Sequence, residues 1–173
     1  PTLNADSIYH RLLTPPSELL DLIAKRFGRE VIKEDGTLDR GILAGKVFAA
    51  GAEEELEALN SITHGRVVSK MEALIAQYSG MGCRALTADV PLLFESGFDR
   101  ECDLTVAVIA DKAIRTERIM KRDGISYEYA MMRVNAQYPN EYFEQKCEYV
   151  LHNDGSADRF RKECKNLFKE VLK

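Results

Sequence analysis

The sequence lacks any apolar run of the roughly 18–20 residues that a bilayer-spanning helix requires. It also lacks an excess of positive charge, because 24 Lys and Arg residues stand against 28 Asp and Glu residues and give a net charge of −4. We therefore expect neither a membrane nor a nucleic acid as a partner. Any phosphate-binding site must be a local cluster of cations rather than the surface as a whole.

Cysteine is scarce and has no metal-binding spacing. The four cysteines form no CxxC pair and have no close His partner, which argues against a zinc site and against a disulfide framework. They are typical of reduced thiols in a cytosolic protein, so we expect a cytoplasmic location. The chain of 173 residues, with 45% apolar and 30% charged residues, fits about one globular domain with a hydrophobic core.

Short apolar stretches predict buried strands at 84–90, 104–110 and 149–151, and residues 1–4 predict the end of a fourth. Between the strands, apolar residues recur at helical spacing. One helix is predicted to open after the stretch Thr14-Pro15-Pro16-Ser17 and to close at Gly28, and Ser126 and Ser156 are predicted N-caps of two later helices. The alternation predicts an α/β fold with a parallel sheet, and residues 8–80 predict a helical region beside it.

Asp89 opens the stretch DVPLLFESG (89–97), directly at the end of the predicted strand 84–90. Ligands of open α/β sheets bind at the carboxyl ends of the strands, and phosphoryl-transfer proteins place an acidic residue there to hold Mg²⁺. Alternatively, Asp89 caps the following turn through its own side chain. The spacing leaves both interpretations open.

Asp6 follows the first predicted strand in the stretch Asn4-Ala5-Asp6-Ser7-Ile8. It is either a second carboxylate at the sheet edge or part of a helix N-cap, with Asp6 or Ser7 accepting from free N–H groups. Taken alone, the stretch favours the cap.

Basic residues recur at three- and four-residue spacing at Arg115, Arg118 and Arg122, and Arg133 follows in the next predicted helix. Arginine forks suit bidentate phosphate contacts, so these side chains could close on a polyphosphate. The alternative is a solvated face, neutralised by neighbouring carboxylates. The acidic candidates are Asp111, Glu117, Asp123 and Glu128.

Three other features are weaker evidence for a functional site. His64 lies on a predicted helix, where a lone His is more often structural than catalytic. The stretch DGTLDR (35–40) is explained locally by a turn followed by an Asp cap. The stretch GILAGKV (41–47) is similar to a phosphate loop, but it has the wrong spacing and no preceding strand.

In this order, the motifs resemble those of the dephospho-coenzyme A kinase family. DVPLLFESG is the most specific match. The other stretches that carry the resemblance are NADSI (4–8), DGTLDR (35–40), LNSITH (59–64), Glu117-Arg118 with RDG (122–124), RVNAQ (133–137) and NDGS (153–156).

The resemblance implies a P-loop kinase fold and transfer of the ATP γ-phosphate, with Mg²⁺, to the ribose 3′-hydroxyl of dephospho-coenzyme A. It implies a five-stranded parallel core (1–7, 81–112 and 145–173), a helical coenzyme A-binding domain (8–80) and a lid (113–144). We expect a monomer or a small homo-oligomer.

The resemblance also assigns roles to individual residues. The implied catalytic residues are Asp6 as general base, Arg122 and Arg133. The implied substrate-binding residues are Asp89, His64, Asp39 and Arg40, with Asp89 also at the metal. The implied ATP-binding residues are Arg118, Asn153 and Gly155.

Two substitutions depart from the family pattern, because Asn4 replaces the first Asp of a usual pair and Gly65 stands where Pro is common. In addition, no GxxxxGK[ST] phosphate loop occurs in the sequence. We therefore expect the natural protein to be longer at its amino end, and these 173 residues alone to transfer phosphate poorly. The alternatives are a non-catalytic coenzyme A- or nucleotide-binding module and another small-metabolite P-loop kinase.

Overall fold

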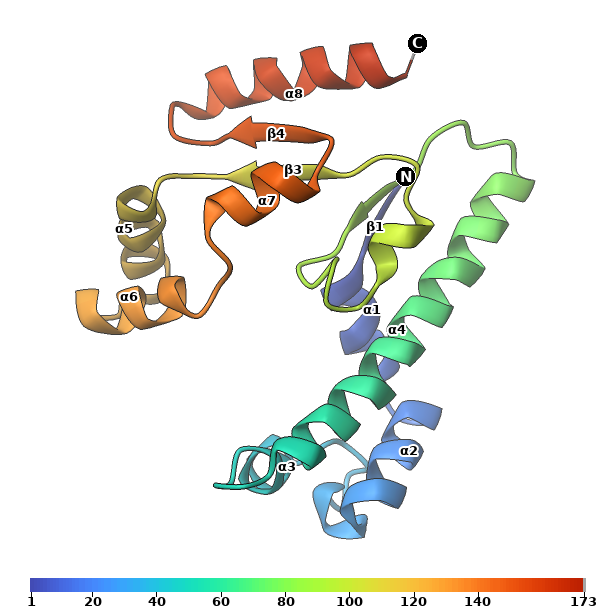
Figure 1. Ribbon diagram of the computed structural model, residues 1–173. Coiled ribbons are helices and arrows are strands. Elements are labelled where there is room, and N and C mark those ends of the chain that lie inside the picture. Colours follow the sequence, from blue (N-terminus) through green and yellow to red (C-terminus); the bar gives the residue numbers. More distant parts are fainter. Residues whose placement is uncertain (173) are drawn as a thin grey trace. The chain divides into compact units, whose positions relative to one another are not determined.

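The structure is a computed structural model that describes residues 1–172. Contacts between residues divide the chain into two units, Pro1–Asp99 and Arg100–Lys173. Figure 1 shows the elements of each unit along the chain.

The first unit contains a short parallel strand pair and most of its residues are helical. Strand β1 (Thr2–Asn4) pairs with β2 (Thr87–Asp89), so that Asn4 lies opposite Asp89 at the carboxyl ends of both strands. The helices are α1 (Ala5–Leu12), α2 (Glu18–Phe27), α3 (Arg40–Val47) and α4 (Glu53–Gly80), with the 3₁₀ turns η1 (Arg29–Val31) and η2 (Phe98–Glu101).

Helix α2 has the limits that the sequence predicts. The hydroxyl of Ser17 accepts from the backbone N–H groups of Leu19 and Leu20, at 3.1 and 3.3 Å. The helix ends at Gly28, whose φ of 95° lies in the region that favours glycine. Its inner face places Ile23, which is fully buried, in a core with residues from α1, α3 and η1. A helix this short is only marginally stable in water by itself, so most of its stability comes from burial of this apolar face.

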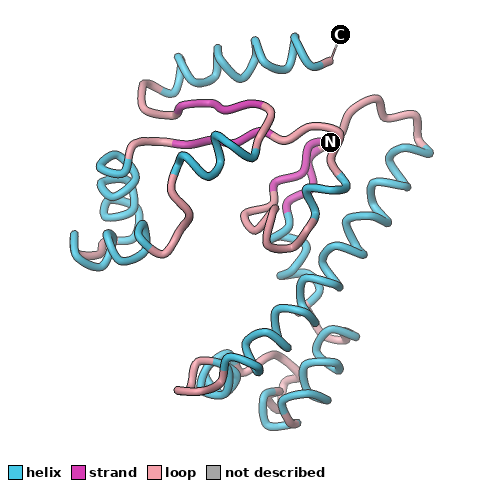
Figure 2. The backbone as a smooth tube through the Cα atoms, in the orientation of Figure 1, coloured by secondary structure: helices cyan, strands magenta, loops and turns pink. Residues whose placement is uncertain are grey.

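Helix α4 runs for 28 residues and passes through Gly65 without a break. Figure 2 shows it as one uninterrupted helix. It packs against α1, α2 and α3, and Thr63 and Met71 are its buried residues. Helix α4 therefore joins the other three helices of the first unit.

The second unit contains the other strand pair. Strand β3 (Val106–Ile109) lies parallel to β4 (Tyr149–His152), with Ile109 opposite His152. The helices are α5 (Lys112–Asp123), α6 (Tyr127–Asn135), α7 (Asn140–Lys146) and α8 (Ala157–Val171). Ser126 and Ser156 cap α6 and α8 by accepting from the N–H groups of Tyr129 and Arg159, as predicted.

The parallel α/β architecture is confirmed, with one difference. Residues 1–172 contain four strands in two separate parallel pairs, whereas the family resemblance implies a five-stranded core. Strands β2 and β3 are also shorter than predicted, because only residues with a partner across the ladder form strand hydrogen bonds, whereas β4 extends one residue beyond the predicted 149–151. Residues 8–80 contain no strand, only an isolated bridge between Ile32 and Leu38. The division into core, coenzyme A-binding domain and lid stays a prediction.

Among the described residues, none of the helices combines the length and the apolar character that crossing a bilayer demands.

Candidate active site

A cavity of about 290 Å³ lies in the first unit, between α1, α4 and the chain that follows β2. This volume is close to the lower end of the roughly 300–1,000 Å³ found for small-molecule sites. Most of its wall is apolar, and polar groups enter from Asp6, Asn60, His64 and Ser96. An apolar cavity with a few convergent polar groups is typical of a site for an organic ligand. The apolar walls are formed by Ala5, Leu59, Val67, Val68, Met71, Val90, Pro91, Leu92 and Phe98.

Asp6 lies in the first turn of α1 and lines this cavity. Its residue surface is exposed, and its carboxylate has no hydrogen bond or ion pair to any residue within 1–172. The interpretation of Asp6 or Ser7 as the helix cap is wrong. The cap is Asn4, whose side-chain oxygen accepts from the N–H of Ser7 at 2.7 Å. Asp6 therefore keeps a free carboxylate.

Asn4 also reaches the second strand. Its Nδ2 donates to Oδ2 of Asp89 at 2.7 Å, and the parallel register places the two residues side by side at the strand ends. Within residues 1–172, the Asp89 carboxylate makes no bond to the turn that follows it, so the interpretation of Asp89 as a turn cap is wrong. Asp89 Oδ1 stays free, next to Val90, which lines the cavity.

His64 lies on α4 and is half-buried in the cavity wall. The cavity therefore brings together Asp6 and His64, which are 58 positions apart in the sequence. A periodicity argument could place each on a helix, but it could not place the two helices side by side.

Tyr9 is a cavity residue that the sequence analysis missed. Burial raises the pKa of its phenol, and the positive charge of Arg40 opposes part of that rise. The available signal was spacing, because Tyr9 lies three residues after Asp6 and so shares its face of the helix.

Asp39 and Arg40 begin α3 and do not line this cavity. Oδ1 of Asp39 accepts from the N–H groups of Gly41 and Ile42, both at 3.0 Å, so the predicted cap is confirmed. Arg40 Nη2 lies 3.5 Å from Nδ1 of His10. The substrate-binding role of Asp39 and Arg40 stays a prediction.

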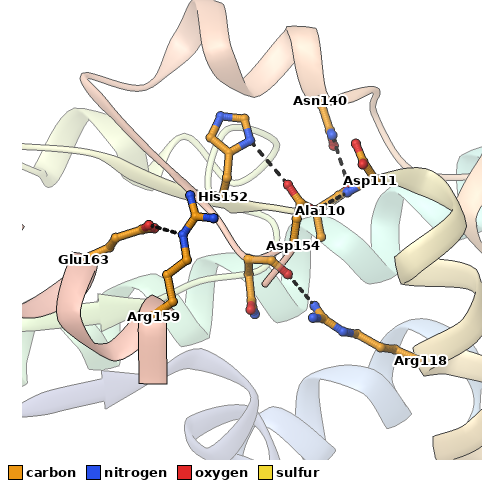
Figure 3. Close-up of polar contacts among 9 residues, drawn as sticks. Ala110, Asp111, Arg118, Asn140, His152, Asp154, Arg159 and Glu163 are labelled. Atoms are coloured by element: carbon orange, nitrogen blue, oxygen red, sulfur yellow. Dashed lines mark hydrogen bonds and ion pairs between the residues drawn. The ribbon is translucent and has the colours of Figure 1, made fainter. Parts of the chain in front are cut away.

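In the second unit, polar groups gather where β3 and β4 end (Figure 3). The backbone N–H of Asp111 donates to Oδ1 of Asp154 at 2.7 Å, and Arg118 Nη1 donates to the carbonyl oxygen of Asn153 at 2.7 Å. The backbone of Asn153 is held to Ile109 by an N–H···O bond of 2.8 Å. Two of the predicted ATP-binding residues, Arg118 and Asn153, are therefore in direct contact.

In the loop after β4, Gly155 lies close to the Arg159 side chain. A Cβ added at Gly155 would lie 3.3 Å from Cδ of Arg159, and Arg159 is itself paired with Glu163 at 2.9 Å. Asn140 Nδ2 donates to the carbonyl oxygen of Ala110 at 3.2 Å, which ties the start of α7 to the end of β3. Together these contacts define the backbone at the carboxyl edge of this strand pair.

The predicted catalytic arginines Arg122 and Arg133 share one carboxylate, that of Asp123. Arg122 Nε lies 2.6 Å from Asp123 Oδ1, and Arg133 Nη1 lies 2.6 Å from Oδ2. Among the four carboxylates considered as neutralising partners, Asp123 is the one that binds these arginines. Arg115 and Arg118 are not part of this contact, since Arg115 binds Gln137 at 3.5 Å and Arg118 binds Asn153.

Residues 1–172 offer no metal site made of protein ligands alone. Within residues 1–172, no three His, Cys, Asp or Glu side chains are grouped so that they could hold an ion. The free Oδ1 of Asp89 is a single carboxylate ligand. Such a site fits Mg²⁺ when water and substrate phosphates complete its coordination shell.

Comparison with known proteins agrees with this arrangement of motifs. The family model for dephospho-CoA kinase matches residues 1–159. A dephospho-CoA kinase of Corynebacterium glutamicum is 31% identical over 170 residues, which are 98% of this chain and 84% of the relative. A dephospho-CoA kinase of Symbiobacterium thermophilum is 35% identical over 159 residues, 92% of this chain and 66% of the relative.

Solved structures give the same result. A Thermus thermophilus protein superposes with a TM-score of 0.75 at 30% identity, over 99% of this chain and 84% of that protein. The dephospho-CoA kinase from Campylobacter jejuni gives a TM-score of 0.69 at 27% identity, with the same coverage. With a family match over residues 1–159 and relatives above 30% identity along nearly the whole chain, this protein belongs to the dephospho-CoA kinase family.

Proposed function

We propose that this protein transfers the γ-phosphoryl group of ATP to the ribose 3′-hydroxyl of dephospho-coenzyme A, the last step in the synthesis of coenzyme A. Membership of the dephospho-CoA kinase family supports this reaction. The single observation of the structure that carries the proposal is the free carboxylate of Asp6 in a largely apolar cavity, beside His64.

Asp6 is the general base in this proposal. Proton transfer needs a carboxylate within hydrogen-bond reach of the hydroxyl, and the carboxylate must not be committed to another donor. Asp6 meets the second condition because Asn4, and not Asp6, caps α1. The apolar wall would exclude water, which competes with the sugar hydroxyl as phosphoryl acceptor.

Asp89 would hold Mg²⁺ through its free Oδ1, with water and phosphate oxygens as the other ligands. When bound, Mg²⁺ neutralises charge on the transferring phosphate. The contribution of the chain is to fix the Asp89 carboxylate, and the hydrogen bond from Asn4 does so through Oδ2.

The second unit supplies the residues that we assign to ATP. Arg122 and Arg133 would neutralise phosphate charge, because phosphoryl transfer depends mainly on positioning and on electrostatic stabilisation. Arg118, Asn153 and Gly155 would contact the nucleotide. His64, Asp39 and Arg40 are assigned to the coenzyme A side of the reaction.

A direct test compares phosphoryl acceptors. The native protein, with any residues encoded before Pro1, is incubated with Mg-ATP and each acceptor in turn. We expect dephospho-coenzyme A to be consumed far faster than adenosine, shikimate or a nucleoside monophosphate. A preference for one of those acceptors would assign a different kinase activity, and binding of dephospho-coenzyme A without turnover would assign a non-catalytic module.

A further inference from the structure

A three-residue ionic cluster joins the end of α5 to α6. Arg122 contacts the Asp123 carboxylate twice, through Nε at 2.6 Å and Nη2 at 3.1 Å. Arg133 donates to the same carboxylate from the neighbouring helix at 2.6 Å. The Asp123 side chain keeps only 23% of its accessible surface, so it is the most enclosed member of the cluster.

The cluster is not explained by helix stability. Asp123 is the last residue of α5, and a negative charge at a helix C-terminus is unfavourable to the helix dipole. The hydrogen bonds from Arg122, together with the charges of Arg122 and Arg133, hold the pKa of Asp123 below its usual range. The carboxylate therefore stays ionised as the common partner of two cations.

The two guanidinium groups keep unused hydrogen-bond donors. One carboxylate between two arginines leaves one positive charge in excess, and within residues 1–172 neither arginine is paired with a second carboxylate. The side chains of Arg122 and Arg133 are 72% and 48% exposed. Arg133 is also held over the ring of Tyr129, 5.2 Å from its centroid. The guanidinium groups of Arg122 and Arg133 are thus held close together, and their remaining N–H donors are exposed to solvent.

We propose that Asp123 is a positioning residue that holds Arg122 and Arg133 together as a single phosphate-binding pair. This inference rests on the proposed function, which assigns both arginines to ATP. Without the carboxylate, the two cations repel each other and their flexible side chains separate. With the Asp123 carboxylate present, the two guanidinium groups already lie together before ATP binds, so binding does not have to overcome their mutual repulsion.

The proposal predicts a change in ATP affinity opposite to the one expected if Asp123 acted only through its negative charge. Removing a negative charge near a polyanion site should tighten ATP binding if Asp123 acts only through its charge. Removing a positioning group should weaken it. The isosteric variant Asp123→Asn separates the two effects, and Asp158→Asn is the matched control. Asp158 also pairs with an arginine in this unit, Arg161, but its side chain is 92% exposed.

The experiment measures ATP binding by equilibrium titration and the kinetic constants for both substrates, using the native protein. For Asp123→Asn we expect roughly tenfold weaker ATP binding, the equivalent of one hydrogen bond between charged groups. We expect KM for dephospho-coenzyme A to be unchanged. Asp123→Glu should recover part of the loss, and Asp158→Asn should bind ATP as the wild type does or slightly tighter.

A double variant tests whether Asp123 acts through the arginines. In an Arg133→Gln background, Asp123→Asn should weaken ATP binding by less than it does in the wild type. Additive effects, or ATP binding at least as tight as wild type in Asp123→Asn, would overturn the proposal. So would a large drop in melting temperature with equal losses in every kinetic constant, since that indicates a structural role. Wild-type protein that binds ATP without phosphorylating dephospho-coenzyme A would instead refute the proposed function.

Discussion

The capping pattern around Asp6 suggested a structural role for a carboxylate that the fold leaves free. The stretch from Asn4 to Ile8 has several residue types that can cap a helix, and the sequence favoured Asp6 or Ser7. The structure gives the cap to Asn4, because this residue has the extended backbone of a strand end, with φ −114° and ψ 115°. Asp6 lies two residues after this cap, already inside the first turn of the helix, and its carboxylate is not used in capping.

We therefore predict that Asp6→Asn lowers kcat by about 10²- to 10⁴-fold, the usual contribution of a general base. The melting temperature should change little, since the Asp6 carboxylate makes no bond within residues 1–172 that the amide would lose. Steady-state kinetics and thermal melting of the same preparations measure both quantities. A variant that melts earlier and keeps its turnover would show that Asp6 is structural.

Asn4 makes two hydrogen bonds, one that caps α1 and one to Asp89, and substitutions can separate their effects. Asn4→Ser keeps a side-chain oxygen that can cap α1, whereas Asn4→Ala removes it and should cost about 1 kcal/mol of unfolding free energy. Both variants lose the amide donor to Asp89. We expect both to lower kcat by roughly tenfold, as for one hydrogen bond to a charged group.

Chemical denaturation and kinetics of the two Asn4 variants distinguish the roles. The expected pattern is a difference in stability with a shared loss of activity. If turnover instead follows stability, with Asn4→Ser active and Asn4→Ala impaired, the bond to Asp89 has no part in positioning that carboxylate.

At the scale of elements, Glu148 joins the starts of β3 and β4. Its Oε2 accepts from the backbone N–H of Thr105 at 2.8 Å and from the Thr105 hydroxyl. These hydrogen bonds hold the pKa of Glu148 below its usual range. A carboxylate with a lowered pKa in the folded state adds stability above its unfolded pKa of about 4.3. That stability is lost as the pH falls through the lower, folded value.

We predict that Glu148→Gln reduces the loss of stability between neutral and acidic pH. The amide can still accept a hydrogen bond, but it has no proton to gain in this range. Thr105→Val, which removes the hydroxyl donor, should give an intermediate pH dependence. Urea denaturation midpoints at a series of pH values below 7 measure the effect. An unchanged pH dependence in Glu148→Gln would mean that other carboxylates account for the acid sensitivity.

The elements themselves were largely predictable from local chemistry. Asp39, Ser126 and Ser156 all cap helices as the sequence indicates, because a cap depends only on the next few residues. Contacts over long separations were not predictable. The bond between Asn4 and Asp89 spans 85 positions, and no local pattern selects that pair.

The arginine series shows the limit of spacing arguments. Residues 115, 118 and 122 share a helix face by periodicity, but the structure gives each a different partner: Gln137, Asn153 and Asp123. Spacing determines which way a side chain leaves the helix, while the partner depends on what packs there. Asp123, adjacent in sequence to Arg122, was considered only as a neutralising charge, and its simultaneous contact with Arg133 required the fold.

For the whole molecule, the order of motifs was more informative than any single motif. Asp6, Asp89 and the arginines each had an ordinary structural explanation, which the sequence left open for Asp89 and favoured for Asp6. Their order along the chain matched one family, and the family comparison over residues 1–159 confirms it. The two parallel strand pairs then explain why carboxylates and backbone groups gather at strand ends, where ligands of α/β proteins bind.

In the proposed reaction, phosphate is transferred to one hydroxyl of one acceptor. This transfer is tested most directly by incubating the native protein with dephospho-coenzyme A and ATP labelled at the γ-phosphate, and by locating the label in the product. We predict that the label appears in coenzyme A on the ribose 3′-oxygen, and that Asp6→Asn almost abolishes it. Label found only in inorganic phosphate, or at another position of the acceptor, would rule out transfer to the ribose 3′-hydroxyl.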